Sequence, residues 1–247
     1  MVVLLAVSTD LETSAAVAVT AGVFAGQLTI GWGNDLVDAS RDRDVGRPDK
    51  PLANGELSRG VVVRCLVVAA VACVLLSLLA GWRSGLVHLC VGVAAGHAYN
   101  LGMKSTPWSW LPYALAFGTL PAVVTLAGDT PQWPHPWILG MAAALGVGAH
   151  FLNTLPDFDD DAATGVRGLP HRLGATATRV VGTLLLVAGS VVAVLGPMGP
   201  PATWTLATLG LVILLGLLAL SGRGKAPFYA AMAIALIDVV LLAVVSA

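Results

Sequence analysis

Residues 61–82 read VVVRCLVVAAVACVLLSLLAGW, and this stretch decides the class of fold. As an α-helix it would be about 33 Å long, which is enough to cross the hydrocarbon core of a bilayer. The rest of the chain has the same character, because 57% of its 247 residues are hydrophobic and only 11% are charged. A soluble domain carries roughly 25% charged residues. The composition therefore excludes a soluble globule and predicts a polytopic membrane protein.

Apolar stretches long enough to span a bilayer occur eight times along the chain. They cover residues 13–32, 61–82, 85–103, 108–127, 137–155, 176–195, 204–220 and 227–245. Met1–Val7 is also apolar, but it is too short to span. We predict an all-α transmembrane bundle of about eight full spans plus a truncated first helix, with residues 1–247 forming a single domain.

The basic residues fall almost entirely on one predicted side of this bundle. Twelve of the thirteen Lys and Arg residues lie there, and Arg83 alone lies on the other side. Loops rich in Lys and Arg face the cytoplasm in most membrane proteins. We therefore expect an integral protein of the cell membrane whose charged loops are cytoplasmic. The net charge of −1 argues against a basic nucleic-acid binder, so we expect no nucleic-acid partner.

A first acidic cluster follows the first span on this cytoplasmic side. If the helix continues past Trp32, Asn34, Asp38 and Asp42 recur every four residues, and Asp35 lies three before Asp38. All four side chains would then project from one face of the helix. Like charges on one face require a compensating cation. Oxygen ligands without His or Cys favour a hard cation, Mg²⁺ or Ca²⁺.

A second acidic cluster follows the fifth span, on the same predicted side. Asp157 and Asp161 are four residues apart, Asn153 lies one turn earlier, and Gly165 and Arg167 follow. Either cluster alone is compatible with a solvated loop. Two clusters of similar design on one membrane face favour a shared site instead, and we predict that they face each other across one cavity.

These residues resemble the motifs of the UbiA family of intramembrane prenyltransferases. The first family motif appears as Asn34, Asp35, Asp38, Asp42, Arg47, Lys50 and Pro51, and the second as Asp157, Asp161, Gly165 and Arg167. Tyr99 and Lys104 look like the family's Tyr and Lys at the end of an intervening helix. The one departure is Lys50, where the family usually has an Arg. A Lys keeps the positive charge but loses the paired donors of a guanidinium.

The resemblance implies a fold, a reaction and a set of site residues. The family has nine transmembrane helices, and Met1–Val7 looks like the tail of the first. The implied reaction is Mg²⁺-dependent transfer of a prenyl group from an isoprenyl diphosphate to an aromatic or lipid-like acceptor within the membrane. The implied metal ligands and catalytic residues are Asp35, Asp38, Asp42, Asp157 and Asp161. The expected substrate-binding residues are Asn34, Arg47, Lys50, Tyr99, Lys104, Asn153 and Arg167.

Two other functions remain open at this point. A terpene cyclase of the same family would ionise the same donor but quench the cation internally, without an acceptor. A transporter would use the acids as a cation site near the middle of the bilayer. Among other polar residues in the spans, His97, Asn100 and His150 are secondary candidates for contacts with the acceptor or the prenyl cation. For Asp238, a structural pairing across helices is favoured over catalysis.

Overall fold

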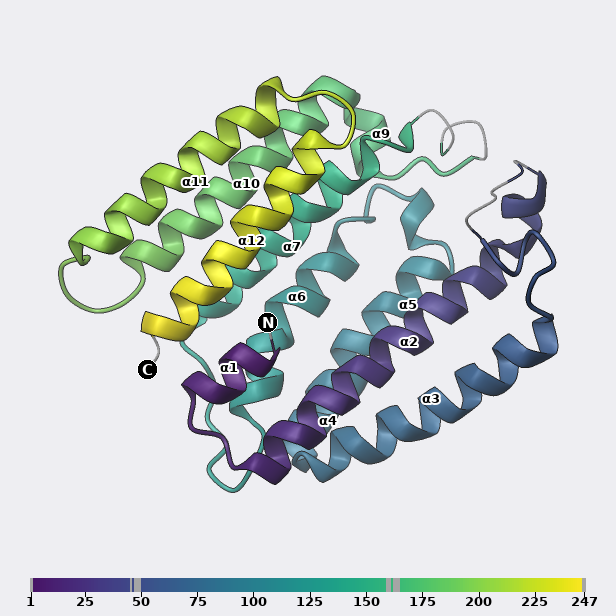
Figure 1. Ribbon diagram of the computed structural model, residues 1–247, viewed down its shortest axis with the longest axis horizontal. Coiled ribbons are helices and arrows are strands. Elements are labelled where there is room, and N and C mark those ends of the chain that lie inside the picture. Colours follow the sequence, from purple (N-terminus) through teal and green to yellow (C-terminus); the bar gives the residue numbers. More distant parts are fainter. Residues whose placement is uncertain (1, 45, 47–49, 159–160, 162–164, 246–247) are drawn as a thin grey trace.

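The computed structural model describes residues 2–44, 46, 50–158, 161 and 165–245, and every regular element in these ranges is helical (Figure 1). The elements are α1 (Val2–Ser8), α2 (Thr13–Asp44), α3 (Arg59–Leu79), α4 (Trp82–Val87), the π-helix η1 (His88–Val93), α5 (Ala94–Asn100), the 3-10 helix η2 (Met103–Ser105), α6 (Leu111–Thr125), α7 (Pro136–Thr154), α9 (Leu169–Leu173), α10 (Ala175–Leu195), α11 (Thr203–Ser221) and α12 (Ala226–Val245). The prediction of an all-helical bundle is confirmed.

The lengths of the helices modify the prediction of eight full spans. Within the described ranges, six helices are long and apolar enough to cross a membrane: α2, α3, α7, α10, α11 and α12. The other two predicted spans are helical but different. Helix α6 has only 15 residues, or about 22 Å, and residues 82–100 form one helical stretch that passes through the π-turn η1. Helix α1, with seven residues, is too short to span, as predicted.

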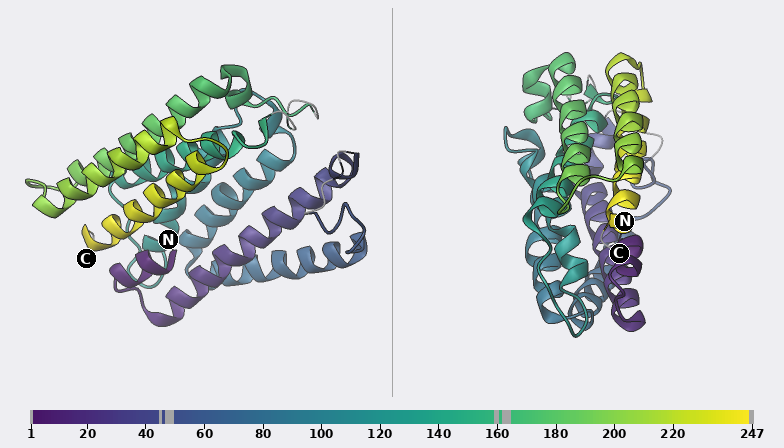
Figure 2. Two further views of the ribbon diagram at one scale, coloured as in Figure 1. Left: turned by 45° about the horizontal axis from the view of Figure 1, so that its top comes forward. Right: turned by 90° about the vertical axis from the view of Figure 1, so that its left-hand side faces the viewer.

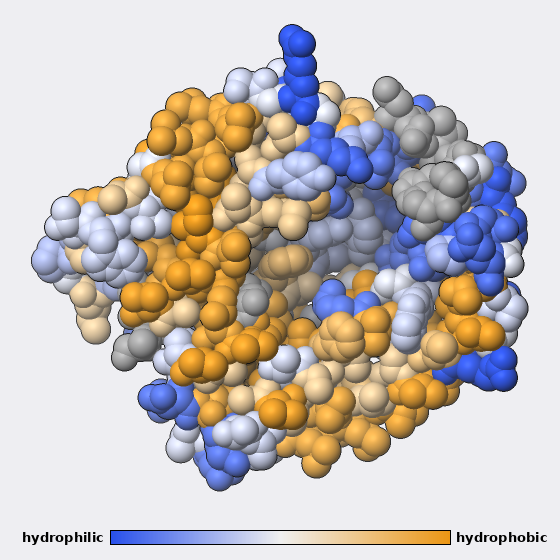
Figure 3. Space-filling model, in the orientation of Figure 1, coloured by the Kyte–Doolittle hydropathy of each residue, from blue (hydrophilic) through white to orange (hydrophobic). Residues whose placement is uncertain are grey.

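Large hydrophobic side chains cover the outside of this bundle. On α3, Leu75 is 57% exposed and Leu79 is 75% exposed, and α11 presents Leu214 and Leu217 in the same way. Exposing so many large apolar side chains to water is unfavourable, whereas the apolar tails of lipids solvate them. Figure 3 shows the same hydrophobic surface around a hollow in the middle of the molecule. The chain is an integral membrane protein.

The helices form two groups, with α6 between them. Helices α2, α3, α4 and α5 pack together on one side, and α7, α10, α11 and α12 pack on the other. Helix α6 contacts both groups, since it packs against α5 and η1 as well as against α7 (Figure 1). The main core cluster lies in the second group, where Leu152, Leu186, Ile234 and Val212 are fully buried. The hollow seen in Figure 3 lies between the two groups.

Small residues set the close approach of α7 and α10. A Cβ atom added to Gly148 would lie 2.8 Å from the carbonyl oxygen of Gly182, and one added to Gly182 would lie 2.9 Å from Cβ of Phe151. Gly and Ala at helix contacts in membranes allow backbones to approach in this way. The contact fixes α7, the helix that leads into the second acidic cluster.

The two acid-bearing segments lie at the same end of the bundle. Figure 1 places the C-terminal end of α2, the end of α5 and α9 together, opposite the two chain termini, and the left view in Figure 2 agrees. The bundle therefore gathers segments that are far apart in the sequence at one membrane face.

Candidate active site

The first acidic cluster occupies the last turns of α2. The first span was expected to reach its end at Trp32, but α2 runs without a break to Asp44 and Trp32 lies inside it. Asp35, Asp38 and Asp42 consequently follow the helical spacing predicted from the sequence. Asp38 is 5% exposed and Asp42 is 3% exposed, and buried carboxylates are stable only with charged or hydrogen-bonding partners.

Three cations supply those partners. The Nζ atom of Lys104 lies 2.5 and 2.6 Å from the two carboxylate oxygens of Asp38. Nη2 of Arg41 lies 3.0 Å from Oδ2 of Asp38 and 3.6 Å from Oδ1 of Asp42. Lys50 donates to Oδ1 of Asp35 at 2.7 Å. Sequence analysis selected both lysines but missed Arg41, although its position three residues after Asp38 on a helix was a usable signal.

The second acidic cluster begins after α7 and does not continue it. Helix α7 ends at Thr154, two residues before Pro156, which has no N–H group to continue the helical hydrogen bonds. One helical turn nevertheless follows, in which the N–H of Asp161 donates to the carbonyl oxygen of Asp157 at 2.8 Å. The two carboxylates remain one turn apart.

His171 contacts this second cluster from α9. Its Nε2 atom lies 3.5 Å from Oδ2 of Asp161, and its ring stacks on Phe158 with centroids 4.6 Å apart. Burial raises the pKa of Asp161, and the charges of His171, Arg41 and Lys104 partly offset that rise. Burial also lowers the pKa of His171, against the effect of Asp161. No sequence motif included His171, so the analysis of spacing alone missed it.

The two acidic clusters influence each other electrostatically. Asp161 interacts with Arg41 and Lys104, which are the partners of Asp38. Tyr99, at the end of α5, interacts with both Asp38 and Asp161. The two clusters are thus near enough for the charges of one to act on the other.

An aromatic cluster lies beside this site. Tyr99 and Tyr113 pack edge to face, with ring centroids 5.2 Å apart. Tyr113 stacks on His150 at 4.2 Å, and His150 is 2% exposed. His150, a secondary candidate, therefore lies among the aromatic rings next to the acids, whereas Tyr113 was not singled out because its sequence context is that of an ordinary apolar span.

The remaining candidates have varied positions. Asn153 and Arg167 are exposed at the same end of the bundle, and Asn34 is half-buried on α2. His97 lies 3.3 Å from the hydroxyl of Thr29, and Asn100 donates to a backbone carbonyl of α2 at 2.8 Å, so both tie α5 to α2. Arg47 lies outside the described residues.

The chemistry of these side chains fits Mg²⁺, which prefers carboxylate oxygens and takes only one or two of them together with substrate phosphate. In the arrangement described, Lys104, Arg41 and Lys50 engage the oxygens of the first cluster. Accordingly, no group of three His, Cys, Asp or Glu side chains gathers closely enough to hold a metal in the described part of the chain. Sparse carboxylates next to cations suit a site that is completed by a diphosphate.

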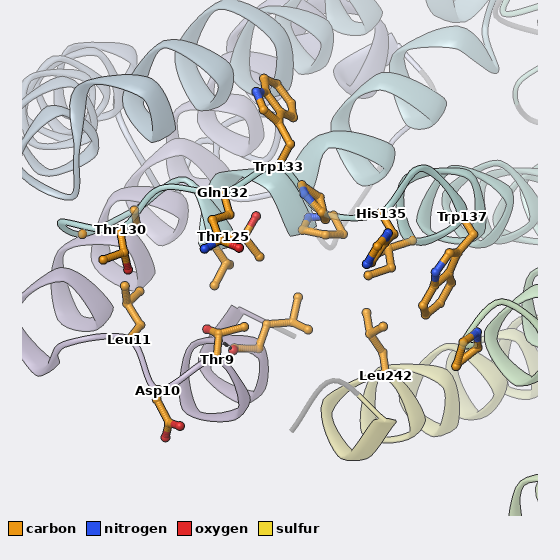
Figure 4. A pocket seen from close by; sticks show the side chains of 18 of the residues that line it. Thr9, Asp10, Leu11, Thr125, Thr130, Gln132, Trp133, His135, Trp137 and Leu242 are labelled. Carbon is orange, nitrogen blue, oxygen red and sulfur yellow. Dashed lines mark hydrogen bonds between the residues drawn. The ribbon is translucent and has the colours of Figure 1, made fainter. Parts of the chain in front are cut away.

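A different cavity, of about 770 Å³, lies at the opposite end of the molecule (Figure 4). Its lining includes Asp10 and Thr9 before α2, Gln132 and His135 between α6 and α7, and Leu242 of α12. None of the acids of the two clusters lines it. The cavity is therefore separate from the candidate active site.

Asp238 also lies away from the acidic clusters. It is fully buried on α12, and its Oδ2 accepts a hydrogen bond from Ser190 of α10 at 2.7 Å. This contact between two helices agrees with the structural pairing favoured from the sequence.

Comparison with known sequences identifies relatives of one kind. The chain matches the UbiA prenyltransferase family over residues 1–243. It is 26% identical over 204 residues to a digeranylgeranylglyceryl phosphate synthase of Methanopyrus kandleri, covering 78% of this chain and 72% of the relative. It is 23% identical over 187 residues to a protein of the same name from Methanothrix thermoacetophila, covering 72% of this chain and 67% of the relative.

Solved structures share the fold. A UbiA homologue from Aeropyrum pernix K1 superposes with a TM-score of 0.77 at 16% identity, covering 96% of this chain and 93% of the other. A UbiA homologue from Archaeoglobus fulgidus, bound to GPP and Mg²⁺, superposes with a TM-score of 0.74 at 16% identity, covering 98% and 92%.

Proposed function

Because this chain belongs to the UbiA prenyltransferase family, and is thus a transferase of alkyl groups other than methyl, we propose that it transfers the prenyl group of an isoprenyl diphosphate to an acceptor in the membrane. The reaction takes place at the end of the bundle where the two acidic clusters meet. The observation that carries the proposal is the ion pairing of Lys104 and Arg41 with Asp38, because both cations also act electrostatically on Asp161 of the second cluster. The catalytic domain extends over the whole chain.

The two acidic clusters bind the diphosphate end of the donor. Five carboxylates would share the Mg²⁺ ions that accompany the diphosphate, with one or two carboxylates to each ion: Asp35, Asp38, Asp42, Asp157 and Asp161. When bound, Mg²⁺ supplies Lewis-acid chemistry that neutralises the diphosphate and makes it a better leaving group. Solved structures of a UbiA homologue from Archaeoglobus fulgidus, one with GPP and Mg²⁺ and one with DMAPP and Mg²⁺, support the pairing of this metal with a prenyl diphosphate.

The cations of the site add fixed positive charge where negative charge develops. Lys104 and Arg41 lie against Asp38, so they are held in place next to the leaving diphosphate. Lys50 and Arg167 contribute from the loops, Arg47 adds a further positive charge, and Asn34 and Asn153 contribute amide groups. As the bond between C1 of the prenyl group and the diphosphate oxygen breaks, its electron pair leaves with the diphosphate.

The aromatic cluster and the apolar bundle receive the prenyl cation. Tyr99, Tyr113 and His150 present π-systems next to the acids, and such rings attract a cation by their quadrupoles. The apolar walls exclude water, so the acceptor is the nucleophile that forms the new bond to C1. The proton that the acceptor loses passes to the released diphosphate or to water at the cytoplasmic end.

The acceptor is a lipid-like alcohol carrying a phosphate, in preference to an aromatic compound. This choice rests on the two relatives that are digeranylgeranylglyceryl phosphate synthases. A terpene cyclase finds no support, since the relatives and family are prenyltransferases. A cation transporter is disfavoured for the same reason, and also because the acids lie at the end of α2 and beyond the end of α7.

Product analysis tests the proposal. The purified protein is incubated with Mg²⁺ and prenyl diphosphates of increasing length, each with a glyceryl phosphate ether lipid, with an aromatic acid or with no acceptor. We expect a prenylated glyceryl phosphate by mass spectrometry, and no product in EDTA. A prenylated aromatic acid would show that the acceptor is aromatic. A hydrocarbon released without any acceptor would show that the protein is a terpene cyclase. No consumption of any donor would overturn the proposed function.

A further inference from the structure

Ser109 lies at a junction of three segments around the site. It is fully buried in the turn between η2 and α6. Its Oγ atom accepts a hydrogen bond from the N–H of Leu169, the first residue of α9, at 2.9 Å. The same oxygen lies 3.4 Å from Nε2 of His150 on α7. One hydroxyl group thus contacts α9 and α7 from the segment that carries Lys104.

The approach of these segments is close enough to require glycine at position 168. A Cβ atom added to Gly168 would lie 2.7 Å from Oγ of Ser109 and 2.7 Å from the carbonyl oxygen of Lys104. The φ angle of Gly168 is −65°, which any residue adopts, so the need for glycine arises from space alone. The backbones of the Lys104 turn and of α9 are therefore in direct contact here, and Ser109 bridges them.

Each of the two bridged segments carries a partner of one acidic cluster. Lys104 binds both oxygens of Asp38, in the first cluster. His171, on α9, contacts Asp161, in the second. The relative position of the two segments therefore sets the relative position of Lys104 and His171, and through them the spacing of the two acidic clusters.

We propose that Ser109 is a positioning residue for prenyl transfer, whose hydroxyl sets the spacing of the two acidic clusters around the diphosphate. The expected effect on kinetics rests on the proposed function. The expected effect of Ser109 on the spacing of the two acidic clusters does not. Ser109 touches no reacting group, so its loss leaves the chemistry intact and weakens the binding of diphosphate and metal together.

Ser84 provides a matched control. It is also buried, at 1% exposure, and its Oγ donates to the carbonyl oxygen of Val123 at 2.6 Å, at the opposite end of the bundle. Ser84→Ala and Ser109→Ala each remove one buried hydroxyl group and its hydrogen bonds. Only Ser109→Ala alters the spacing of the acids. Gly168→Ala disturbs the same junction from its other side.

The kinetic test compares these three variants with the wild-type protein. For Ser109→Ala and Gly168→Ala we expect the KM for the prenyl diphosphate and the Mg²⁺ concentration at half-maximal rate to rise by roughly tenfold, which is the effect of about 1.4 kcal/mol. For Ser84→Ala we expect both values to stay within twofold of wild type. If both the KM and the Mg²⁺ requirement were unchanged in Ser109→Ala, or rose equally in Ser84→Ala, Ser109 would have no positioning role.

A distance measurement separates this inference from the proposed function. Spin labels are attached at Leu101 and Leu173, which are 76% and 43% exposed, after Cys65, Cys73 and Cys90 are replaced. We expect a narrow distance distribution in the wild-type background and in Ser84→Ala, and a shifted or broadened one in Ser109→Ala and Gly168→Ala. An unchanged distribution in both junction variants overturns the inference, whether or not the protein consumes a prenyl diphosphate.

Discussion

The buried charged residues at this site stabilise one another. Asp38 is 5% exposed, and its carboxylate is balanced by Lys104 and Arg41. Removing one member of such a buried pair leaves the other without compensation, and this is costly. Removing a charge at this site therefore affects both function and local structure. Substitutions that keep the shape of the side chain, such as Asp to Asn, best separate the two effects.

The acids at the centre of the two clusters should be indispensable. Asp38→Asn and Asp157→Asn keep the side-chain shape but remove the charge that holds metal and cations. We expect the rate to fall by about 10²–10³-fold, as is typical when an electrostatic group is removed from an active site. The measurement is the rate of prenyl transfer at saturating Mg²⁺, with monodispersity in detergent as the check on folding.

Asp129→Asn serves as the control for these two variants. Asp129 is exposed and lines the cavity at the opposite end of the molecule. Its substitution should leave the rate within twofold of wild type. A near-normal rate in Asp38→Asn or Asp157→Asn would remove that residue from the set of metal ligands.

Lys50 should affect donor binding more than stability. Its ion pair with Asp35 is partly exposed, with both side chains 28% accessible, and such pairs contribute about 0–1 kcal/mol to stability. Lys50→Ala should raise the KM for the donor severalfold without a measurable change in thermal midpoint. Lys50→Arg, which restores the family's usual residue, should keep or lower that KM. Equal KM values in all three proteins would limit Lys50 to a surface role.

At the scale of the elements, the position of α7 relative to α10 decides where the second acidic cluster begins. The two helices approach at Gly148 and Gly182, where a side chain has no room. Helix α7 then ends at Thr154, two residues before Pro156. Helix packing in the middle of the bundle thus determines where Asp157 and Asp161 lie.

Two glycines of the same helix test this dependence. In Gly148→Ala the new Cβ would lie 2.8 Å from the carbonyl oxygen of Gly182, and we expect a loss of about 1–3 kcal/mol of stability from overpacking. Gly140 has nothing within 4 Å of its Cβ position, so Gly140→Ala should leave stability unchanged or raise it by up to about 1 kcal/mol. Thermal midpoints in detergent compare the two, and equal midpoints would contradict the close contact.

At the scale of the whole molecule, the bundle has two chemically different ends. One end carries both acidic clusters and their cations, and the other carries the chain termini and the cavity of Figure 4. The bias of Lys and Arg predicts that the acidic end faces the cytoplasm. Donor and acceptor headgroups should consequently approach from that side.

Labelling of intact cells checks this sidedness. Cysteine is introduced at Glu56, an exposed residue of the acidic end, or at Met198, which is 97% exposed at the other end, after the native cysteines are replaced. A membrane-impermeant maleimide should label Met198→Cys in intact cells and Glu56→Cys only after the cells are opened. The reverse pattern would place the acidic clusters outside.

Much of this protein could be predicted from the sequence because the signals are local. Apolar runs of span length, such as 61–82, predict helices in lipid, since the backbone must satisfy its own hydrogen bonds there. The spacing of Asp35, Asp38 and Asp42 likewise follows from the periodicity of a helix that continues past Trp32. The motifs that carry the family resemblance are of the same local kind.

Other features depend on contacts between distant segments, and only the tertiary structure decided them. Lys104 lies 66 residues from Asp38 in the sequence, and no local pattern predicts that its Nζ binds both carboxylate oxygens. His171 and Ser109 belong to no motif, and they enter the site because helix packing brings α9 against the Lys104 turn. The periodicity of the sequence specifies which residues share a helix face. The packing of the bundle determines which residues pair with the buried charges.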